Sequence, residues 1–409
     1  WAPDGKSIYI FELNRDQNHM RLVQYDALTG NVVRTVLEEK HDKYVEPMHP
    51  LAFLPWDDTK AVMQSQRDGY NHLYLLDLEK DELKQITTGK WVVQQFVGFN
   101  TMARRLIFRS NEADPRKSCL YSVKVSGGKR TPLGAQEGVC YQAQLSKSGA
   151  AVISAYTAPD VPRIINLLST TTGKGSNILT AKDTWKENGY CIPTFKSGSI
   201  KAADGITNLY YRMVLPSDFD EKKKYPTIVY VYGGPHAHLV DASWHWSSRG
   251  WETYMAQKGY IVFILDGRGS EWRGRDFEQA TFRQLGTVEC QDQYKGVEYL
   301  MSLPYVDKDR MGVHGWSFGG FMTTNLMLTF PEVFKVGVAG GPVIDWNYYE
   351  VMYGERYMDT PEQNPEGYKN SNLRLRAGNL KGRLQLIIGY NDPVCVPQHT
   401  LSFIRACID

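Results

Sequence analysis

The stretch Met311-Gly312-Val313-His314-Gly315-Trp316-Ser317-Phe318-Gly319-Gly320 decides the fold of this chain. It predicts a buried strand that ends at His314 and is followed by a helical stretch from Phe321 to Leu328. Between the two, Gly315 to Gly319 has the pattern G-x-S-x-G, in which a serine lies on a sharp turn between a strand and a helix with its Oγ exposed. Glycine suits such a turn because side chains at these positions collide with the neighbouring strand or helix. The pattern therefore predicts that Ser317 is a nucleophile.

Apolar runs alternate with helical segments on both sides of this turn. Buried strands that alternate with helices indicate a mostly parallel sheet covered on both faces. Together with the serine turn, the alternation predicts an α/β-hydrolase domain over residues 184–409. The runs are Tyr225 to Tyr232, Gly259 to Leu265, Met311 to His314, Val336 to Ala339 and Leu384 to Ile388.

Residues 1–183 show a different pattern, of short aromatic or β-branched strands bounded by turn residues. A similar phrase recurs about every 45 to 50 residues, which is in the range of four-stranded propeller blades. We therefore expect a partial β-propeller of about four C-terminal blades, the first already under way at Trp1. A β-sandwich with accidental similarity is the alternative. The copies are Gln24-Tyr25-Asp26, Tyr74-Leu75-Leu76-Asp77, Leu120-Tyr121-Ser122-Val123 and Asn166-Leu167-Leu168.

Composition and charge argue against several classes of protein. The formal net charge is +2 and both signs are interspersed along the chain, which does not favour nucleic acid or an anionic membrane as a partner. The apolar runs are far shorter than the roughly 20 residues that cross a bilayer, so we expect no membrane span. Six cysteines lie far apart without the spacing that zinc requires, so we expect no metal and no cofactor. One or two disulfides are allowed but not required.

A nucleophilic serine also needs an acid and oxyanion donors. In this fold the chain order is Ser, then Asp, then His, and Asp392 follows a predicted strand at the edge where sites in open α/β sheets gather. An aspartate before Pro393 equally suits a plain turn, which is the alternative role. The backbone N–H of Phe318, directly after the nucleophile, is the expected first oxyanion donor.

The histidine of such a triad is not evident in this sequence. His399 follows Asp392 but falls in the predicted helix Pro397 to Cys407, too close to serve. We therefore expect the base beyond Asp409, so that residues 184–409 lack the C-terminal end of their domain. Without a base to deprotonate Ser317, residues 1–409 alone are expected to be inactive.

Several motifs together resemble the dipeptidyl peptidase IV branch of the prolyl oligopeptidase family of serine peptidases, including bacterial prolyl tripeptidyl peptidases. The match spans the whole catalytic half and, more loosely, the propeller. The motifs are Tyr230-Val231-Tyr232-Gly233-Gly234-Pro235, Asp266-Gly267-Arg268-Gly269-Ser270, Gly315 to Gly320, Trp346-Asn347-Tyr348-Tyr349 and Tyr353-Gly354-Glu355-Arg356-Tyr357.

The resemblance implies roles for further residues. Tyr232 would donate its phenolic O–H to the oxyanion, and a pocket for a proline ring would be lined by Val343, Trp346, Tyr349, Tyr353 and Val394. An apolar aromatic pocket suits a compact ring without an N–H, although on spacing alone these aromatics equally suit plain core packing.

Two positions concern how the substrate is held. Val394 stands where dipeptidyl peptidase IV proper has an asparagine, so a polar contact to substrate should be missing. Glu350 stands where the tripeptidyl branch also has a glutamate, and it would either hold the free ammonium of the substrate or be a solvated surface charge.

The leading interpretation is a serine exopeptidase that releases N-terminal dipeptides after Pro or Ala. Its substrates would be peptides with a free N-terminus and a penultimate or, for tripeptide release, third-position Pro. The alternatives are a prolyl tripeptidyl peptidase, an acylaminoacyl peptidase or esterase, and a non-catalytic binding protein that uses a propeller face. The resemblance also implies a homodimer in the periplasm or secreted from the cell.

Overall fold

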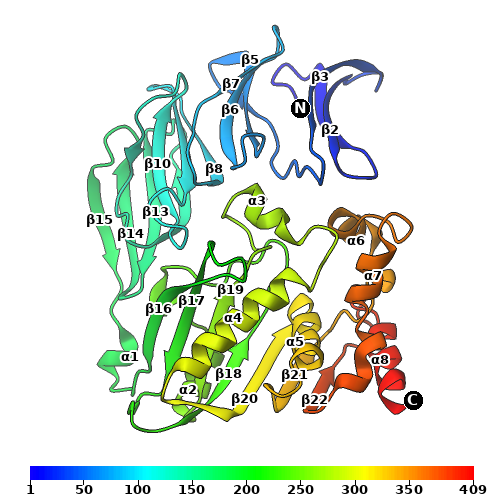
Figure 1. The fold of residues 1–409 in the computed structure, drawn as a ribbon. Coiled ribbons are helices and arrows are strands. Elements are labelled where there is room, and N and C mark those ends of the chain that lie inside the picture. The colour runs from blue at the N-terminus through cyan, green and yellow to red at the C-terminus, as the bar shows by residue number, and fades with distance from the viewer. The chain divides into compact units, whose positions relative to one another are not determined.

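The computed structural model describes every residue from Trp1 to Asp409 and divides into two compact units (Figure 1). The first unit holds Trp1–Lys182 together with two short segments from later in the chain, Asp241–Trp244 and Trp272–Asp276. The second unit holds Asp183–Val240, His245–Glu271 and Phe277–Asp409.

The first unit consists of four antiparallel sheets that follow one another along the chain. The first sheet has three strands, β1 (Ser7–Leu13), β2 (His19–Asp26) and β3 (Val32–Lys40). The other three sheets have four strands each, with the following bounds. They are β4 (Ala52–Leu54), β5 (Asp57–Ser65), β6 (His72–Asp77) and β7 (Glu82–Gln85); β8 (Val93–Asn100), β9 (Arg105–Ser110), β10 (Cys119–Lys124) and β11 (Thr131–Pro132); and β12 (Val139–Leu145), β13 (Ala151–Ala158), β14 (Val161–Ser169) and β15 (Gly175–Thr180).

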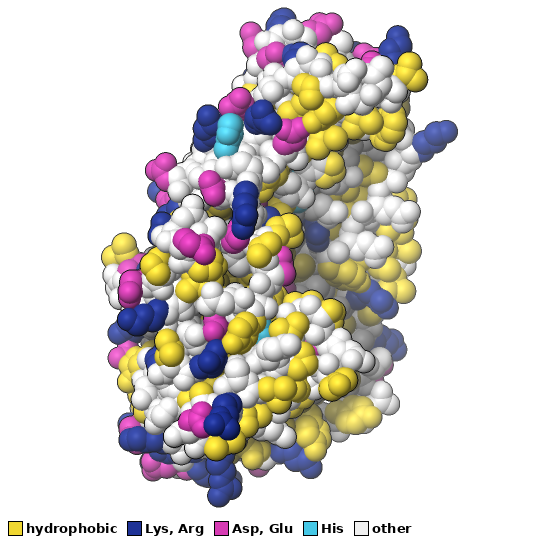
Figure 2. All heavy atoms as spheres, turned by 90° about the vertical axis from the view of Figure 1, so that its right-hand side faces the viewer, with side chains coloured by type: hydrophobic (Ala, Val, Ile, Leu, Met, Phe, Trp, Pro, Cys, Tyr) yellow, Lys and Arg dark blue, Asp and Glu magenta, His cyan; other side chains and the backbone are white.

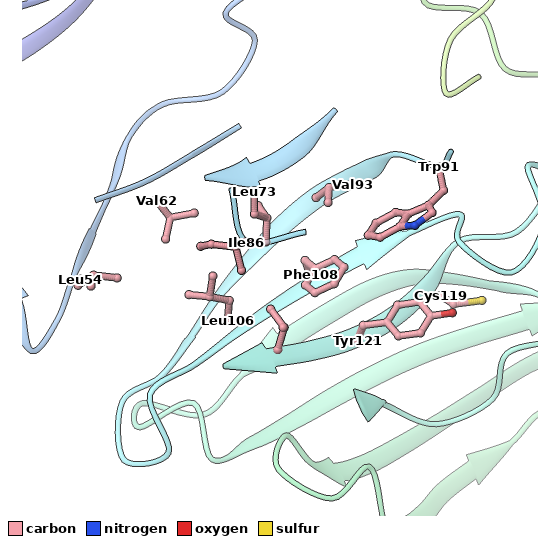
Figure 3. Close-up of a cluster of buried hydrophobic side chains, with 11 residues drawn as sticks. Leu54, Val62, Leu73, Ile86, Trp91, Val93, Leu106, Phe108, Cys119 and Tyr121 are labelled. Atoms are coloured by element: carbon pink, nitrogen blue, oxygen red, sulfur yellow. The ribbon is translucent and has the colours of Figure 1, made fainter. Parts of the chain in front are cut away.

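Successive sheets of this unit pack face to face. One buried cluster joins Val62 and Leu73 of the second sheet to Phe108 and Tyr121 of the third, as Figure 3 shows. Similar clusters join the first sheet to the second and the third to the fourth. A sandwich has only two facing sheets, so this repeated packing does not fit the sandwich alternative. The phrase that recurs in the sequence falls on β2, β6, β10 and β14, the strand that precedes the last one in each sheet.

The second unit contains a seven-stranded sheet in the order β16-β17-β19-β18-β20-β21-β22. The five apolar runs of the sequence form its parallel part, β18 to β22. Two antiparallel strands, β16 and β17, extend the sheet beyond β19 and were not predicted. The strand bounds are β16 (Thr194–Lys201), β17 (Asn208–Leu215), β18 (Tyr225–Tyr230), β19 (Ile261–Asp266), β20 (Val306–Trp316), β21 (Val336–Gly340) and β22 (Arg383–Ile387).

Helices cover both faces of this sheet. The helix α5 (Phe318–Thr329) packs on β20 and β21, where Met327 lies against Gly337. Val336 and Val338 point to the other face, where they line a groove of about 640 Å³ together with Trp251 and Met255 of α2. No helix of the structure combines the length and the apolar composition that crossing a membrane requires. The remaining helices are α1 (Thr184–Glu187), α2 (Gly250–Gln257), α3 (Arg275–Glu278), α4 (Val288–Ser302), α6 (Val351–Met358), α7 (Pro365–Ser371) and α8 (Gln398–Ile408), with short 3₁₀ turns η1 (Trp244–Ser247), η2 (Gln279–Thr281), η3 (Trp346–Tyr348) and η4 (Leu373–Asn379).

Candidate active site

Ser317 lies on the sharp turn between β20 and α5 that the sequence predicts. Its backbone has φ 58° and ψ −118°, in a region that a residue with a side chain rarely adopts. The Ser317 N–H donates to the carbonyl of Gly340 at 2.8 Å, and its own carbonyl accepts from the Phe321 N–H at 3.0 Å. Strain of this kind costs about 1 to 3 kcal/mol and persists only where the surroundings enforce it.

The glycines around Ser317 are required by close backbone contacts. A Cβ on Gly315 would lie 2.2 Å from the carbonyl oxygen of Val231, and one on Gly319 would lie 2.3 Å from the same atom. A Cβ on Gly320 would lie 2.5 Å from the carbonyl oxygen of Gly340. Each distance is far below van der Waals contact, so the turn can form only with glycine at these three positions.

Tyr232 lies beside the nucleophile. Its phenol is close enough to Ser317 for the serine hydroxyl to influence the pKa of the phenol, and its ring lies 6.1 Å from that of Phe318. Burial raises the pKa of the Tyr232 phenol, an effect that the neighbouring Ser317 only partly opposes. The phenol therefore keeps its proton at neutral pH and can donate it to a developing negative charge.

Asp392 lies in the loop between β22 and α8, at the same edge of the sheet as Ser317. Its Oδ1 accepts from the backbone N–H groups of Val394 at 2.9 Å and Cys395 at 3.0 Å. Gly341 directly follows Gly340, whose carbonyl bonds to Ser317. A Cβ atom placed on Gly341 would lie 3.8 Å from Oδ2 of Asp392. One oxygen thus organises the turn, as the alternative role requires, while the other faces the turn next to the nucleophile.

A cysteine that the sequence analysis did not single out is in contact with Ser317. The Sγ of Cys395 lies 3.9 Å from Ser317 Oγ, and the residue is only 5% exposed. Burial raises the pKa of the thiol, and the charge of Asp392 adds to this effect. The predicted pocket residue Val394 is 49% exposed, so the structure places Cys395 rather than Val394 against the nucleophile. The signal available in the sequence was the Asp392 turn, which sends the third residue after it inward.

The predicted aromatic residues form one cluster beneath Ser317. Trp346 is 2% exposed, and its ring lies 5.3 Å from Tyr349 and stacks on Tyr353 at 6.0 Å. Phe318 contacts the same indole at 5.6 Å, so the cluster rests on the first turn of α5. Val343 is also buried, at 1% exposure.

Tyr349 connects this aromatic cluster to the residues around Ser317. Burial raises the pKa of the Tyr349 phenol to about 12, and the nearby Cys395 and Tyr232 contribute to the shift. Trp346, Tyr349 and Tyr353 are thus brought together, Val343 is buried in the same loop, and Val394 is the predicted pocket residue that remains at the surface.

Glu350 has a structural role in this arrangement. Its carboxylate caps the N-terminus of α6 by accepting from the N–H groups of Met352 at 2.9 Å and Tyr353 at 2.8 Å. A carboxylate at this position stabilises a helix and fixes the helix turn that carries Tyr353. The residue is exposed, so its remaining lone pairs face solvent.

Two histidines near the sheet make other contacts. The Nδ1 of His314 lies 2.9 Å from the carbonyl oxygen of Val338. His399 is fully buried, and its Nδ1 accepts from the backbone N–H of Ile344 at 3.0 Å. The hydrogen-bond partners of Ser317 include no histidine.

A buried carboxyl group lies behind the Tyr232 loop. Glu289 of α4 is 1% exposed, and its Cβ lies 3.9 Å from the position of a Cβ on Gly233. One of its oxygens accepts from the Gly286 N–H at 2.9 Å, and the other has no partner. Burial raises the pKa of Glu289 to about 8. The six cysteines are free thiols, and no group of three or more potential ligands is arranged to hold a metal ion.

A strained serine between a parallel strand and a helix, with a tyrosine hydroxyl and an acid at the same edge, defines the class of α/β hydrolases. Two family models match the chain, that of the prolyl oligopeptidase family over residues 246–409 and that of the dipeptidyl peptidase IV N-terminal region over residues 1–163. The chain belongs to the prolyl oligopeptidase family, in its dipeptidyl peptidase IV branch. The sheets of the first unit accordingly belong to a β-propeller region.

Individual relatives agree with this assignment. A probable dipeptidyl-aminopeptidase B of Arthroderma gypseum is 33% identical over 90% of this chain and 41% of its own length. A probable dipeptidyl peptidase 4 of Aspergillus flavus is 30% identical over 93% of this chain and 50% of its own length. The chain spans about half the length of the curated relatives it matches.

Two solved structures share the fold. One, a putative dipeptidyl aminopeptidase IV from Bacteroides ovatus, is 53% identical with a TM-score of 0.95, over 100% of this chain and 60% of that one. The other, dipeptidyl peptidase 4 of Porphyromonas gingivalis, is 29% identical with a TM-score of 0.90, over 98% of this chain and 56% of that one.

Proposed function

We propose that this protein is a serine exopeptidase that releases N-terminal dipeptides after Pro or Ala, through an acyl-enzyme on Ser317. The observation that carries the proposal is the cluster of Ser317 Oγ, the Tyr232 phenol and the buried aromatic residues within one edge of the sheet. A nucleophile, an oxyanion donor and an apolar pocket are the parts that acyl transfer next to a proline needs.

The reaction follows from these positions. Ser317 Oγ attacks the carbonyl carbon of the scissile bond, and the oxyanion that forms accepts from the Tyr232 phenol and the Phe318 N–H. Collapse of this intermediate breaks the C–N bond, releases the amine and leaves an ester on Ser317, which water hydrolyses.

The proton of Ser317 must pass through a base to the leaving amine. We assign this step to a histidine that follows Asp409 in the protein and is oriented by the free oxygen of Asp392. In the same proposal each sheet of the first unit is one blade of the propeller. The proposed domain boundary at 183/184 lies one residue after the division between the two units at Lys182 and Asp183.

The aromatic cluster supports proline as the residue before the scissile bond. We assign Val343, Trp346, Tyr349 and Tyr353 to the apolar walls of the pocket, and Cys395 rather than Val394 to the wall on the side of Ser317. A ring without an N–H leaves no unpaired donor in such a pocket. The capping bonds of Glu350 leave it less free to bind an ammonium group, which favours dipeptide over tripeptide release.

Hydrolysis of chromogenic amides tests the proposal in the full-length protein. We expect a kcat/KM for Gly-Pro amide at least about ten-fold above that for Ala-Ala-Pro amide, and no hydrolysis when the N-terminus is acetylated, since burial of a free ammonium sets the cleavage position. Residues 1–409 alone are the negative control. A preference for Ala-Ala-Pro amide would identify a tripeptidyl peptidase, and a preference for the acetylated substrate an acylaminoacyl peptidase.

Cys395 provides a second prediction for the same enzyme. Methyl methanethiosulfonate is expected to block fluorophosphonate labelling of Ser317, because a disulfide-linked methylthio group on Sγ would lie against Oγ. Cys395→Val keeps the pocket apolar and should retain labelling after the same treatment. The raised pKa of the thiol makes the reaction faster as the pH rises. Equal sensitivity of wild type and variant would assign the effect to another thiol, such as the exposed Cys191 or Cys407.

The proposal extends to a homodimer that is periplasmic or secreted. The exposed apolar residues of α8 are Leu401, Ile404 and Ile408, at 59%, 42% and 73% exposure. Figure 2 shows the side of the molecule that carries α8, where apolar and charged side chains alternate. Sedimentation equilibrium of the full-length protein measures whether it forms a dimer.

A further inference from the structure

The loop between β21 and α6 carries most of the proposed proline pocket, and its backbone is fixed from outside around Ile344. The N–H of Ile344 donates to Nδ1 of His399 on α8 at 3.0 Å, and the N–H of Asp345 makes a longer contact to the same atom at 3.4 Å. The carbonyl of Ile344 accepts from the N–H of Leu373, in η4, at 2.9 Å. Ile344 directly follows Val343 and precedes Trp346 by two residues, so the two bonds of Ile344 fix both pocket residues.

His399 is an unusual choice for this position. Its side chain is fully buried, and because Nδ1 accepts a hydrogen bond, the proton of the neutral ring is on Nε2, which has no partner. An unpaired buried donor is costly, so plain packing would favour an apolar residue. The part of His399 that makes a hydrogen bond is Nδ1, which acts as an acceptor.

The surroundings keep this acceptor available. Burial lowers the pKa of His399 to about 4, against the opposing charges of Asp345 and Asp392. Asp345 is itself engaged by Asn372 at 2.7 Å, and Arg374 of η4 lies 3.6 Å from it. The ring of Tyr348 packs on the imidazole at 5.6 Å. The imidazole is therefore neutral at neutral pH and can accept from Ile344.

The nucleophile is anchored by different contacts. Ser317 bonds to the carbonyl of Gly340, and the N–H of Gly341 donates to the carbonyl of Ile387 at 2.7 Å. None of these bonds involves His399. Loss of the His399 acceptor should consequently release the pocket loop while the serine turn stays in place.

We propose that His399 is a positioning residue for the substrate pocket, in that its Nδ1 fixes the Ile344 peptide and thereby the pocket walls Val343 and Trp346. The proposal rests on the function proposed above, since it assigns to this loop the binding of the residue before the scissile bond. His399 touches neither the substrate nor Ser317 in this role.

A matched pair of variants tests the proposal in the full-length protein. Asparagine offers Oδ1 close to the place of Nδ1, whereas leucine has a similar shape and no acceptor. We expect His399→Leu to raise the KM for Gly-Pro amide at least about ten-fold with kcat within about three-fold of wild type, and His399→Asn to stay within about three-fold in both. The rate of fluorophosphonate labelling of Ser317 should be the same in all three proteins. Equal KM values for the leucine and asparagine variants would overturn the proposal.

Amide hydrogen exchange gives a readout that needs no activity. The Ile344 N–H should exchange faster in His399→Leu than in wild type, and at the wild-type rate in His399→Asn. If wild type fails to cleave proline amides, the proposed function fails, whereas unchanged exchange in the leucine variant refutes the anchoring itself. Should His399→Leu not fold, as judged by thermal unfolding, His399→Met replaces it, since methionine also lacks a nitrogen or oxygen acceptor.

Discussion

We expect Ser317→Ala to abolish fluorophosphonate labelling of the full-length protein and to lower kcat for Gly-Pro amide by at least about 10³-fold. The reason is that no other hydroxyl is presented on the strained turn between β20 and α5, so acyl transfer loses its covalent step. Labelling followed by intact-protein mass spectrometry and steady-state kinetics on the same samples measure both effects. The fold should be unchanged, since Ser317 Oγ has no structural hydrogen bond to backbone.

Tyr232→Phe is the matched control for this loss. It removes one oxyanion donor and leaves the nucleophile, so kcat should fall by about 10²- to 10³-fold while labelling of Ser317 persists. A Ser317→Ala protein that still turns over Gly-Pro amide at a rate near wild type would refute the assignment of the nucleophile. An unchanged kcat in Tyr232→Phe would refute only the role of the phenol.

Glu289→Gln is expected to stabilise the protein at alkaline pH. The pKa of Glu289, raised by burial to about 8, means that the folded protein keeps this proton between pH 4.5 and 8, whereas the unfolded chain releases it. The folded state binds more protons, so the stability that this group contributes is fully present below pH 4.5 and is lost as the pH rises through 8. The whole loss is on the order of 5 kcal/mol.

A glutamine at this position cannot ionise and avoids that loss. Its amide oxygen can still accept from the Gly286 N–H, as Glu289 does at 2.9 Å. Thermal unfolding at pH 5 and pH 9 should therefore show similar midpoints at pH 5 and a higher midpoint for the variant at pH 9. If the difference between the two unfolding midpoints does not increase from pH 5 to pH 9, Glu289 is not a buried neutral carboxyl group.

Glu252 provides the control for this measurement. It is also fully buried but pairs with the guanidinium of Arg212 at 2.7 Å. Glu252→Gln leaves that cation without its partner and should destabilise the protein by about 3 to 5 kcal/mol at both pH values. The two glutamates thus separate a buried neutral acid from a buried ion pair.

The parts of the fold that are buried on both faces could be predicted from the sequence. The parallel strands β18 to β22 appear as continuous apolar runs, and the turn at Ser317 is fixed by glycines whose Cβ atoms would collide with backbone oxygens. β16 was missed for the opposite reason. β16 alternates between exposed and half-buried residues, and its polar sequence lacks an apolar run.

Site residues could be predicted where the chemical type of the side chain determines its role. They were predicted less well where the role depends on where the fold places the residue. Ser317 and Asp392 follow from the chemistry that each supplies. Cys395 was missed because its neighbour Val394 looks more like a pocket residue, and only the turn held by Asp392 shows which of the two points inward. From the sequence, His399 could only be judged as a candidate base and excluded. Its bond to Ile344 joins residues 55 positions apart, so no local sequence pattern indicates it.

The loops around Ser317 follow three adjacent parallel strands, and the contact between Ser317 and Cys395 joins residues 78 positions apart. Closing such a distant loop is entropically unfavourable until β20, β21 and β22 have paired, which places this event late in folding. A ribosome-bound chain that has not yet exposed Cys395 therefore carries the serine without its surroundings.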